Sequence, residues 1–261
     1  MGQPWRAPRV WLAALGAVLL FAAFAAAQFR FQSDGYEPTV KNVAYDGRFT
    51  FARLRYQTAP GGYWYQGLPS WSHGYPDSED KLMRIMNELS ELGPRLDAFN
   101  VFSLDDPELS RYSVAYLCEP GFWLPTEPES AALRTWIEKG GFLIIDDFYN
   151  DRQWAVFERA MKSVLPNGRI VPLDVSHPIF NSFFKIDSLD GMWHPDDEGA
   201  RAKYLGIYED NDPAKRLLVV INFNNDIGDY MEWSGQGVYA INFSNDAYKL
   251  ATNYVVYGLT H

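Results

Sequence analysis

The sequence predicts an α/β fold in which a doubly wound, mainly parallel sheet is flanked by helices. Apolar strand candidates alternate with helical patterns over residues 49–261, and parallel neighbours need crossover helices of this kind. The run FLII at 142–145 is apolar without alternation, as expected for a strand with both faces covered. No internal repeat or linker interrupts the pattern, so residues 49–261 are expected to form a single α/β domain.

The first half of this domain begins with a strand candidate at 49–56. A helix is predicted over 77–93, because apolar side chains recur there at helical spacing. Two further strands are predicted at 98–104 and 112–118. The next helix is the best marked, since Thr126 and Glu129 have the spacing of a capping box and Gly140 follows as a stop signal.

The second half begins with the strand at 142–146. A helix with an apolar stripe of Trp154, Phe157, Met161 and Leu165 is expected to follow it, and then a strand at 169–174. Strands are also predicted at 216–223 and 237–243, around a polar loop at 224–233. A closing helix is predicted at 245–260.

The amino-terminal 27 residues have the layout of a secretory signal. Arg6 and Arg9 precede an uncharged apolar run at 10–27, which ends in three alanines. The run is also close to the shortest length that crosses a bilayer, so an uncleaved inner-membrane anchor is the alternative. Residues 28–48 lack sustained periodicity and are interpreted as an extended leader. The sequence therefore predicts a periplasmic or secreted protein, with membrane contact only if the segment is retained.

Charge and cysteine content exclude several classes of function. The net charge is −10 and the pI is near 4.9, which argues against a nucleic-acid partner because phosphate binding needs a basic surface. Cys118 is the single cysteine, so neither an intramolecular disulfide nor a cysteine-based zinc site is available. No cofactor motif is evident, although the acidic residues are compatible with a divalent cation.

Parallel α/β sheets bind ligands outside the carboxyl ends of their strands. That rule selects the loops at 57–76, 119–125, 147–152 and 224–233, which bring carboxylates, an imidazole and aromatic rings to one edge. We expect these loops to supply the ligand-binding residues Trp64, Trp71, His73, Glu119, Trp123, Asp147, Asn225 and Asp226.

Asp146 and Asp147 follow directly after a predicted buried strand and have two interpretations. They are candidate catalytic or metal-binding acids together with His73, or one of them caps the helix expected near residue 151. His194 precedes a proline and is interpreted as a turn residue. Cys118 is interpreted as inert, because the small flanking residues of a nucleophile elbow are missing.

Several long segments of the sequence, in the same order, resemble one bacterial family. They include WYQGLPSWSHGYP, EPGFWLPTEPE, GGFLIIDDF and SNDAYKLATNYVVYGLTH, and together they resemble the domain of unknown function 4159. The resemblance implies a flavodoxin-like fold similar to class I glutamine amidotransferases, and it implies no established activity. Asp146 and Asp147 stand near the place where those enzymes carry a nucleophilic cysteine, which argues against covalent glutaminase chemistry.

Three functions follow as hypotheses. The first is an exported, non-catalytic module that binds a small molecule, a glycan or an envelope protein. The second is a hydrolase in which Asp146 or Asp147 acts with His73, with or without a metal ion. The third is a subunit of a cell-envelope assembly.

Overall fold

The computed structural model describes residues 36–261. The predicted signal or anchor at 1–27 and the first part of the leader lie outside the described residues. Residues Pro38–His261 form one compact unit. Within 36–261, none of the helices combines the length and the apolar composition that crossing a bilayer requires.

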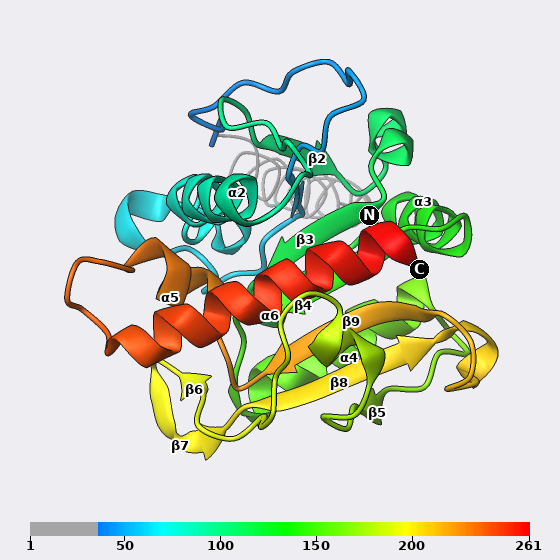
Figure 1. The fold of residues 1–261 in the computed structure, drawn as a ribbon. Helices are drawn as coiled ribbons and strands as arrows, with labels where there is room; N and C mark the ends of the chain where they lie inside the picture. The colour runs from blue at the N-terminus through cyan, green and yellow to red at the C-terminus, as the bar shows by residue number, and fades with distance from the viewer. Residues whose placement is uncertain (1–35) are drawn as a thin grey trace, which may run out of the picture. The chain divides into compact units, whose positions relative to one another are not determined.

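A seven-stranded sheet forms the centre of the described region, which confirms the predicted fold class (Figure 1). Across the sheet the strands are β2 (Asn100–Ser103), β1 (Ala52–Arg55), β3 (Val114–Cys118), β4 (Phe142–Asp146), β9 (Leu217–Phe223), β8 (Lys203–Tyr208) and β5 (Val171–Pro172). The five strands from β2 to β9 are parallel, whereas β8 and β5 are antiparallel to their neighbours. Taken in chain order, the five parallel strands have the flavodoxin-like arrangement 2-1-3-4-5.

Helices cover both faces of the sheet (Figure 1). One face carries α2 (Asp77–Leu89), α5 (Ile227–Glu232) and α6 (Ile241–Thr260), which pack against one another. The other face carries α3 (Glu127–Glu138) and α4 (Asn150–Val164). Short 3-10 helices interrupt the loops at η1 (Tyr65–Gly67), η2 (Ser70–Ser72), η3 (Pro107–Arg111), η4 (Pro120–Phe122), η5 (Pro178–Asn181) and η6 (Glu209–Asn211).

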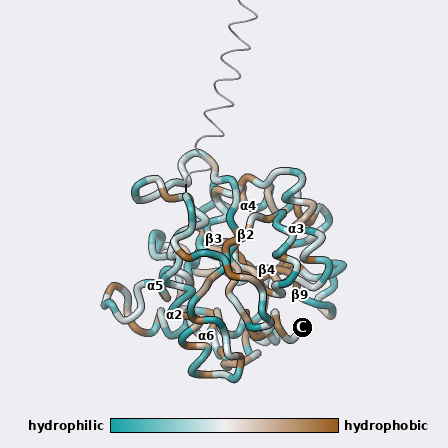
Figure 2. Tube along the Cα trace, turned by 90° about the horizontal axis from the view of Figure 1, so that it is seen from above, coloured by the Kyte–Doolittle hydropathy of each residue, from teal (hydrophilic) through white to brown (hydrophobic). Residues whose placement is uncertain are grey.

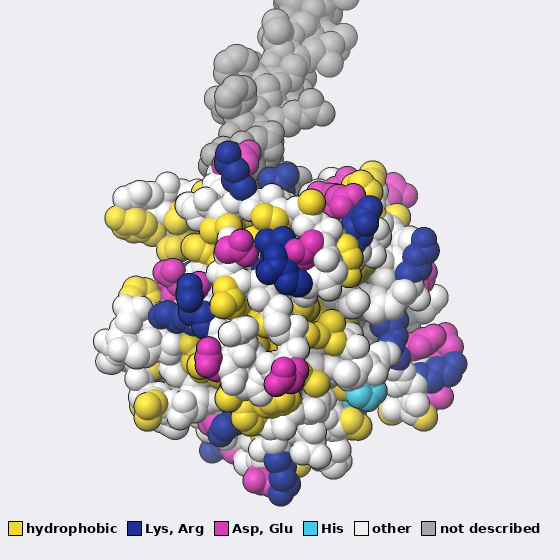
Figure 3. All heavy atoms as spheres, turned by 45° about the horizontal axis from the view of Figure 1, so that its top comes forward, with side chains coloured by type: hydrophobic (Ala, Val, Ile, Leu, Met, Phe, Trp, Pro, Cys, Tyr) yellow, Lys and Arg dark blue, Asp and Glu magenta, His cyan; other side chains and the backbone are white. Residues whose placement is uncertain are grey.

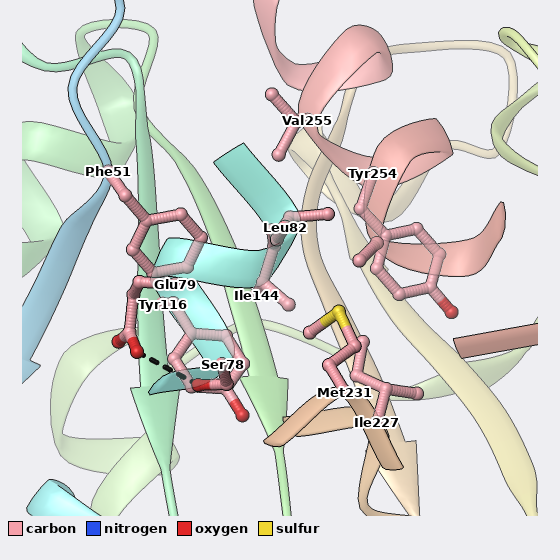
Figure 4. Close-up of a pocket in the computed structure, with 11 residues that line it drawn as sticks. Phe51, Ser78, Glu79, Leu82, Tyr116, Ile144, Ile227, Met231, Tyr254 and Val255 are labelled. Carbon is pink, nitrogen blue, oxygen red and sulfur yellow. Dashed lines mark hydrogen bonds between the residues drawn. The ribbon is translucent and has the colours of Figure 1, made fainter. Parts of the chain in front are cut away.

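The core lies where these helices meet the central strands, which carry the most hydrophobic stretches of the trace (Figure 2). Both faces of β3, β4 and β9 are buried. On the side of α6, a cavity of about 10 Å³ remains between the sheet and three helices (Figure 4). Ile144 of β4, Leu82 of α2 and Ile227 and Met231 of α5 line it. The apolar side of the short helix α5 is thus anchored in the core.

Most strands and helices lie where the sequence predicts them, and the Thr126–Glu129 capping box of α3 is confirmed. The predicted strand at 237–243 is wrong, because α6 already begins at Ile241 and the preceding residues form turns. β9 is bonded to β4 on one side and to β8 on the other, so it has no free edge for that strand. The strand predicted at 169–174 is reduced to the two residues of β5.

Several elements lie in segments where none was predicted, among them β8, which pairs with β9 in the main sheet. A hairpin of β6 (Trp193–His194) and β7 (Asp197–Arg201) precedes β8. The supposed polar loop at 224–233 contains α5. The hairpin and α5 carry residues of the candidate site.

The described part of the leader covers the β2 edge of the sheet. The Asn42 side chain exchanges two hydrogen bonds with the backbone of Val101, and the Asn100 side chain does the same with the backbone of Val43. At the opposite edge, β5 ends with Pro172, which has no backbone N–H to donate.

Candidate functional site

Loops from the ends of three parallel strands meet at the carboxyl edge of the sheet. His73 follows β1, Glu119 follows β3 and Asp147 follows β4. The Nδ1 atom of His73 lies 2.7 Å from Oδ2 of Asp147 and 3.3 Å from Oε1 of Glu119. Three of the residues selected from the sequence therefore form one cluster.

The backbone turns sharply where these strands end. Asp147 has φ 63°, Glu119 has φ 46° and Asn224, after β9, has φ 56°. These φ values are left-handed, although none of the three residues is glycine. The conformation is unfavourable for residues with a Cβ. Asp146 and Asp147 share no hydrogen-bond partner among the described residues, so the two acids have different roles.

Asp147 is buried and accepts hydrogen bonds on both carboxylate oxygens. Oδ2 accepts from His73 Nδ1 and from the Cys118 thiol at 3.2 Å, and Oδ1 accepts from His194 Nε2 at 3.0 Å. Burial alone would raise the pKa of Asp147, but the two imidazoles hold it well below its ordinary value. Asp147 is therefore an ionised centre held by three side chains.

His194 is not the turn residue that the sequence suggested. Its side chain is 4 % exposed, and its Nδ1 accepts the backbone N–H of Asp196 at 3.1 Å. The ring proton of neutral His194 must then be on Nε2, which donates it to Asp147. The sequence carries no local signal for this role, since the hairpin brings His194 to Asp147 from 47 positions away.

His73 and Glu119 connect the buried cluster to solvent, with side chains 26 % and 19 % exposed. Burial lowers the pKa of His73, but the charges of Asp147 and Glu119 outweigh it and raise the pKa to about 10. Burial and the charge of Asp147 raise the pKa of Glu119 to about 8. At neutral pH the metal-free site therefore holds a protonated imidazole beside a carboxyl group that resists ionisation.

Asp146 has a structural role. Its carboxylate accepts hydrogen bonds from Tyr116, from Asn222 and from the backbone N–H groups of Ile227 and Gly228 at the start of α5. Neither Asp146 nor Asp147 bonds to the start of α4, where Asn150 accepts from its own helix. The interpretation of these acids as a cap for that helix is wrong.

Helix α5 contributes three more acids. Asp226 caps the helix by accepting from the N–H of Asp229 at 2.7 Å, and Asp229 accepts from the hydroxyl of Tyr239. Burial raises the pKa of Asp226 well above its ordinary value, raises that of Asp229 and raises that of Glu232 to about 6. One carboxylate oxygen of Glu232, Oε2, is buried without a hydrogen-bond partner among the described residues.

The three tryptophans expected to offer flat contact differ in exposure. Trp64 is 37 % exposed and packs against His73 with ring centroids 5.0 Å apart. Trp71 is 4 % exposed and Trp123 is fully buried, so neither offers an open ring at the surface. Asn225 is also fully buried, and its amide donates to Tyr204 at 3.5 Å.

A buried arginine supports the loop that carries His73. Arg53 on β1 is 0 % exposed, pairs with Glu79 of α2 and donates to the backbone oxygens of Trp71 and His73 at 2.8 and 2.9 Å. The sequence signal for it, a charged residue inside an apolar strand, was missed. Arg53 fixes the position of His73 through the backbone.

Cys118 lies inside the cluster but is poorly suited to act as a nucleophile. Burial and the charge of Asp147 raise the pKa of its thiol well above the ordinary value, and the thiolate is the reactive form.

Within residues 36–261, three sets of side chains have ligand atoms that lie within 4.8 Å of one another and could hold a metal ion: His73, Cys118 and Asp147; Asp147, His194 and Asp226; and His73, Asp229 and Glu232.

Comparison with known proteins identifies the family. No curated protein matches the chain. The sequence pattern of one family, described as Domain of unknown function (DUF4159), matches residues 50–259, which is most of the described region. The chain belongs to this family, the domain of unknown function DUF4159.

Proposed function

We propose that the protein is an exported domain that binds a positively charged ligand at the carboxyl edge of its sheet. The observation that carries the proposal is the imbalance of charge in the cluster. Two imidazoles, those of His73 and His194, stand among six carboxyl groups, those of Glu119, Asp146, Asp147, Asp226, Asp229 and Glu232.

A buried carboxylate without a positive partner is costly, and its pKa rises in response. Five of these six carboxyl groups have raised pKa values, with burial as the largest cause in each. A cation from solution would supply the missing charge. Acidic and basic side chains are interspersed on the face of the molecule drawn in Figure 3.

Hydrolysis is the second candidate, and the 2.7 Å contact between His73 and Asp147 favours it. An aspartate on Nδ1 orients an imidazole so that Nε2 can accept a proton. However, the raised pKa of His73, about 10, keeps the metal-free ring protonated at neutral pH. A protonated ring has no free lone pair to accept a proton, so hydrolysis would need a bound cation to activate the water in place of His73.

Thermal unfolding of the full-length protein in mild detergent tests cation binding. The panel contains Mg²⁺, Ca²⁺, Mn²⁺, Zn²⁺, spermidine and a lysine-rich peptide. A ligand that binds the folded state at 100 times its Kd stabilises it by about 2.7 kcal/mol, which raises the melting temperature.

Asp147→Asn should lose this shift, whereas Asp151→Asn, at an exposed position in α4, should keep it. The proposal fails if none of these cations raises the melting temperature, or if both variants respond alike. If none of the cations raises the melting temperature, the result would favour the envelope-assembly alternative.

Export is part of the proposal and has its own test. Cell fractionation and mass spectrometry of the amino terminus should find a periplasmic or secreted chain that begins near Gln28. An intact amino terminus in the membrane fraction would support anchoring by residues 10–27 instead. A cytoplasmic chain with an intact amino terminus would overturn export.

A further inference from the structure

We propose that His73, Asp229 and Glu232 bind a divalent transition-metal ion, and that Asp147 orients the His73 ring through the hydrogen bond with Nδ1. This inference rests on the proposed function and names the class of cation. Ligand atoms of the three side chains lie within 4.8 Å of one another. One imidazole with two carboxylates is a donor set that suits Zn²⁺ or Mn²⁺.

Helix α5 presents its two acids in the required direction. Asp229 and Glu232 are three positions apart and so lie on the same side of the helix. Ile227 and Met231 occupy the opposite side and point into the core cavity, as Figure 4 shows. Because the apolar side is anchored there, the acids are held toward the loop that carries His73.

The loop and the helix approach closely at Gly74, the residue after His73. A Cβ built on Gly74 would lie 3.2 Å from Oε2 of Glu232, and the residue has φ 70°. A glycine at this position allows the loop to place His73 beside α5. The Glu232 oxygen at this contact is the buried atom without a hydrogen-bond partner.

Hydrogen bonds decide which nitrogen of each histidine is free. Nδ1 of His73 faces two carboxylates and donates to Asp147, so the lone pair that can bind a metal is on Nε2. A carboxylate that accepts from one ring nitrogen while the other binds the ion is the usual support of a metal-bound histidine. His194 has the opposite arrangement, because its Nδ1 accepts a hydrogen bond from the backbone and its Nε2 donates a hydrogen bond to Asp147.

The other two sets of ligands are therefore less suitable. Asp147, His194 and Asp226 would require His194 to lose the bond to its own backbone segment. His73, Cys118 and Asp147 would require ionisation of a buried thiol whose pKa is raised. By contrast, His73 and Glu232 are only partly buried, so an ion bound there is reachable from solvent and keeps a coordination position open for water or a ligand.

Calorimetric titration of the EDTA-treated full-length protein with ZnCl2, and separately with MnCl2, tests the site. We expect one ion per chain. Glu232→Gln and Asp229→Asn keep the size of the side chain and should weaken binding at least 10-fold, and Asp147→Asn should weaken it about 10-fold to 100-fold. Glu138→Gln, at the exposed end of α3, is the matched control and should bind like the wild type.

Co²⁺ as a substitute ion gives a second measurement. Its paramagnetism should strongly shift the ring signals of His73 in the nuclear magnetic resonance spectrum, and the signals of His177 and His261 should stay in place. Circular dichroism verifies that each variant is folded.

Different outcomes separate this inference from the proposed function. If spermidine or the peptide stabilises the protein but neither metal ion binds, the metal site is refuted and cation binding stands. Metal binding that is unchanged in Glu232→Gln and Asp229→Asn would also refute the site while leaving cation binding intact. If no cation of any kind binds, both proposals fall.

Discussion

Asp147 determines the protonation of the residues around it. Its carboxylate accepts a hydrogen bond from His73 on one oxygen and from His194 on the other. Its charge is the largest influence that raises the pKa of His73. A side chain of the same shape without the charge should separate the geometry of the cluster from its electrostatics.

In Asp147→Asn the pKa of His73 should fall from about 10 toward 6.5. Titration of the histidine ring signals by nuclear magnetic resonance, in EDTA, measures this value directly. Asp151→Asn removes an exposed charge from α4 and should leave the value near 10. A His73 pKa that stays near 10 in Asp147→Asn would show that the remaining acids, Glu119 and Asp229, hold the proton.

Asp146 should matter for stability more than for binding. Replacement by alanine leaves several buried donors without an acceptor, among them Tyr116 and Asn222, and each such donor costs about 1–3 kcal/mol. We expect Asp146→Ala to lose at least about 3 kcal/mol of the free energy of unfolding, measured with urea. Asp97→Ala, at an exposed side chain, should change it by less than about 0.5 kcal/mol. A loss below about 1 kcal/mol for Asp146→Ala would mean that water replaces the carboxylate.

The sequence could predict part of this site. His73, Glu119 and Asp147 were found because the carboxyl ends of parallel strands all lie at one edge of the sheet. His194 was not found, because its place depends on a hairpin that packs from a distant part of the chain. Asp229 and Glu232 lie in the segment predicted as a polar loop, and their common direction depends on a helix of six residues, too short for a periodic signal.

At the level of the elements, α6 shows how packing can reverse a local preference. Gly258 lies inside this helix, where alanine is normally better by about 1 kcal/mol. Here an added Cβ would stand 2.6 Å from Phe142 and 2.7 Å from Val114 on the sheet. Overpacking of this kind costs about 1–3 kcal/mol.

Gly258→Ala should therefore destabilise the protein, with a lower urea midpoint. Asn245→Ala, at an exposed position of the same helix, should leave the midpoint unchanged or raise it slightly. A higher urea midpoint in Gly258→Ala would show that the sheet side chains move to accommodate the methyl group.

Elements with a strong local signal were predicted well. β4 matches its predicted range, and α3 was located by its capping box. The strand predicted at 237–243 failed for a tertiary reason: the apolar residues Val238 and Ile241 are 53 % and 78 % exposed, and β9 is already paired on both sides. Apolar composition alone could not distinguish that surface segment from a buried strand.

For the whole molecule, the cluster predicts how stability changes with pH. Glu119 and Asp146 have folded pKa values of about 8 and about 6, against ordinary values of 4.5 and 3.8. The unfolded chain therefore releases these protons at lower pH than the folded chain, and stability falls as pH rises through this interval. His73 acts in the same direction, since its stabilising contribution is complete below 6.5 and is lost as pH rises through about 10. Asp147, with a lowered pKa, stabilises above its ordinary value and loses that contribution only in strong acid.

In EDTA the urea midpoint should be highest near pH 5 and should decrease toward pH 9. Measurements at pH 5, 7 and 9 are sufficient, and Glu119→Gln should show a shallower decrease between pH 5 and 8. A midpoint that is constant or rises over this range would contradict the assignment of raised carboxyl pKa values.

The two edges of the sheet are partly blocked, which limits how the molecule can associate. The Asn42 side chain of the leader occupies the backbone N–H and C=O of Val101 on β2, and a proline ends the two-residue strand at the far edge. Strand addition, in which a guest peptide extends a host sheet, is therefore hindered at both edges. We therefore expect a protein partner to dock on the loops or helices of this domain.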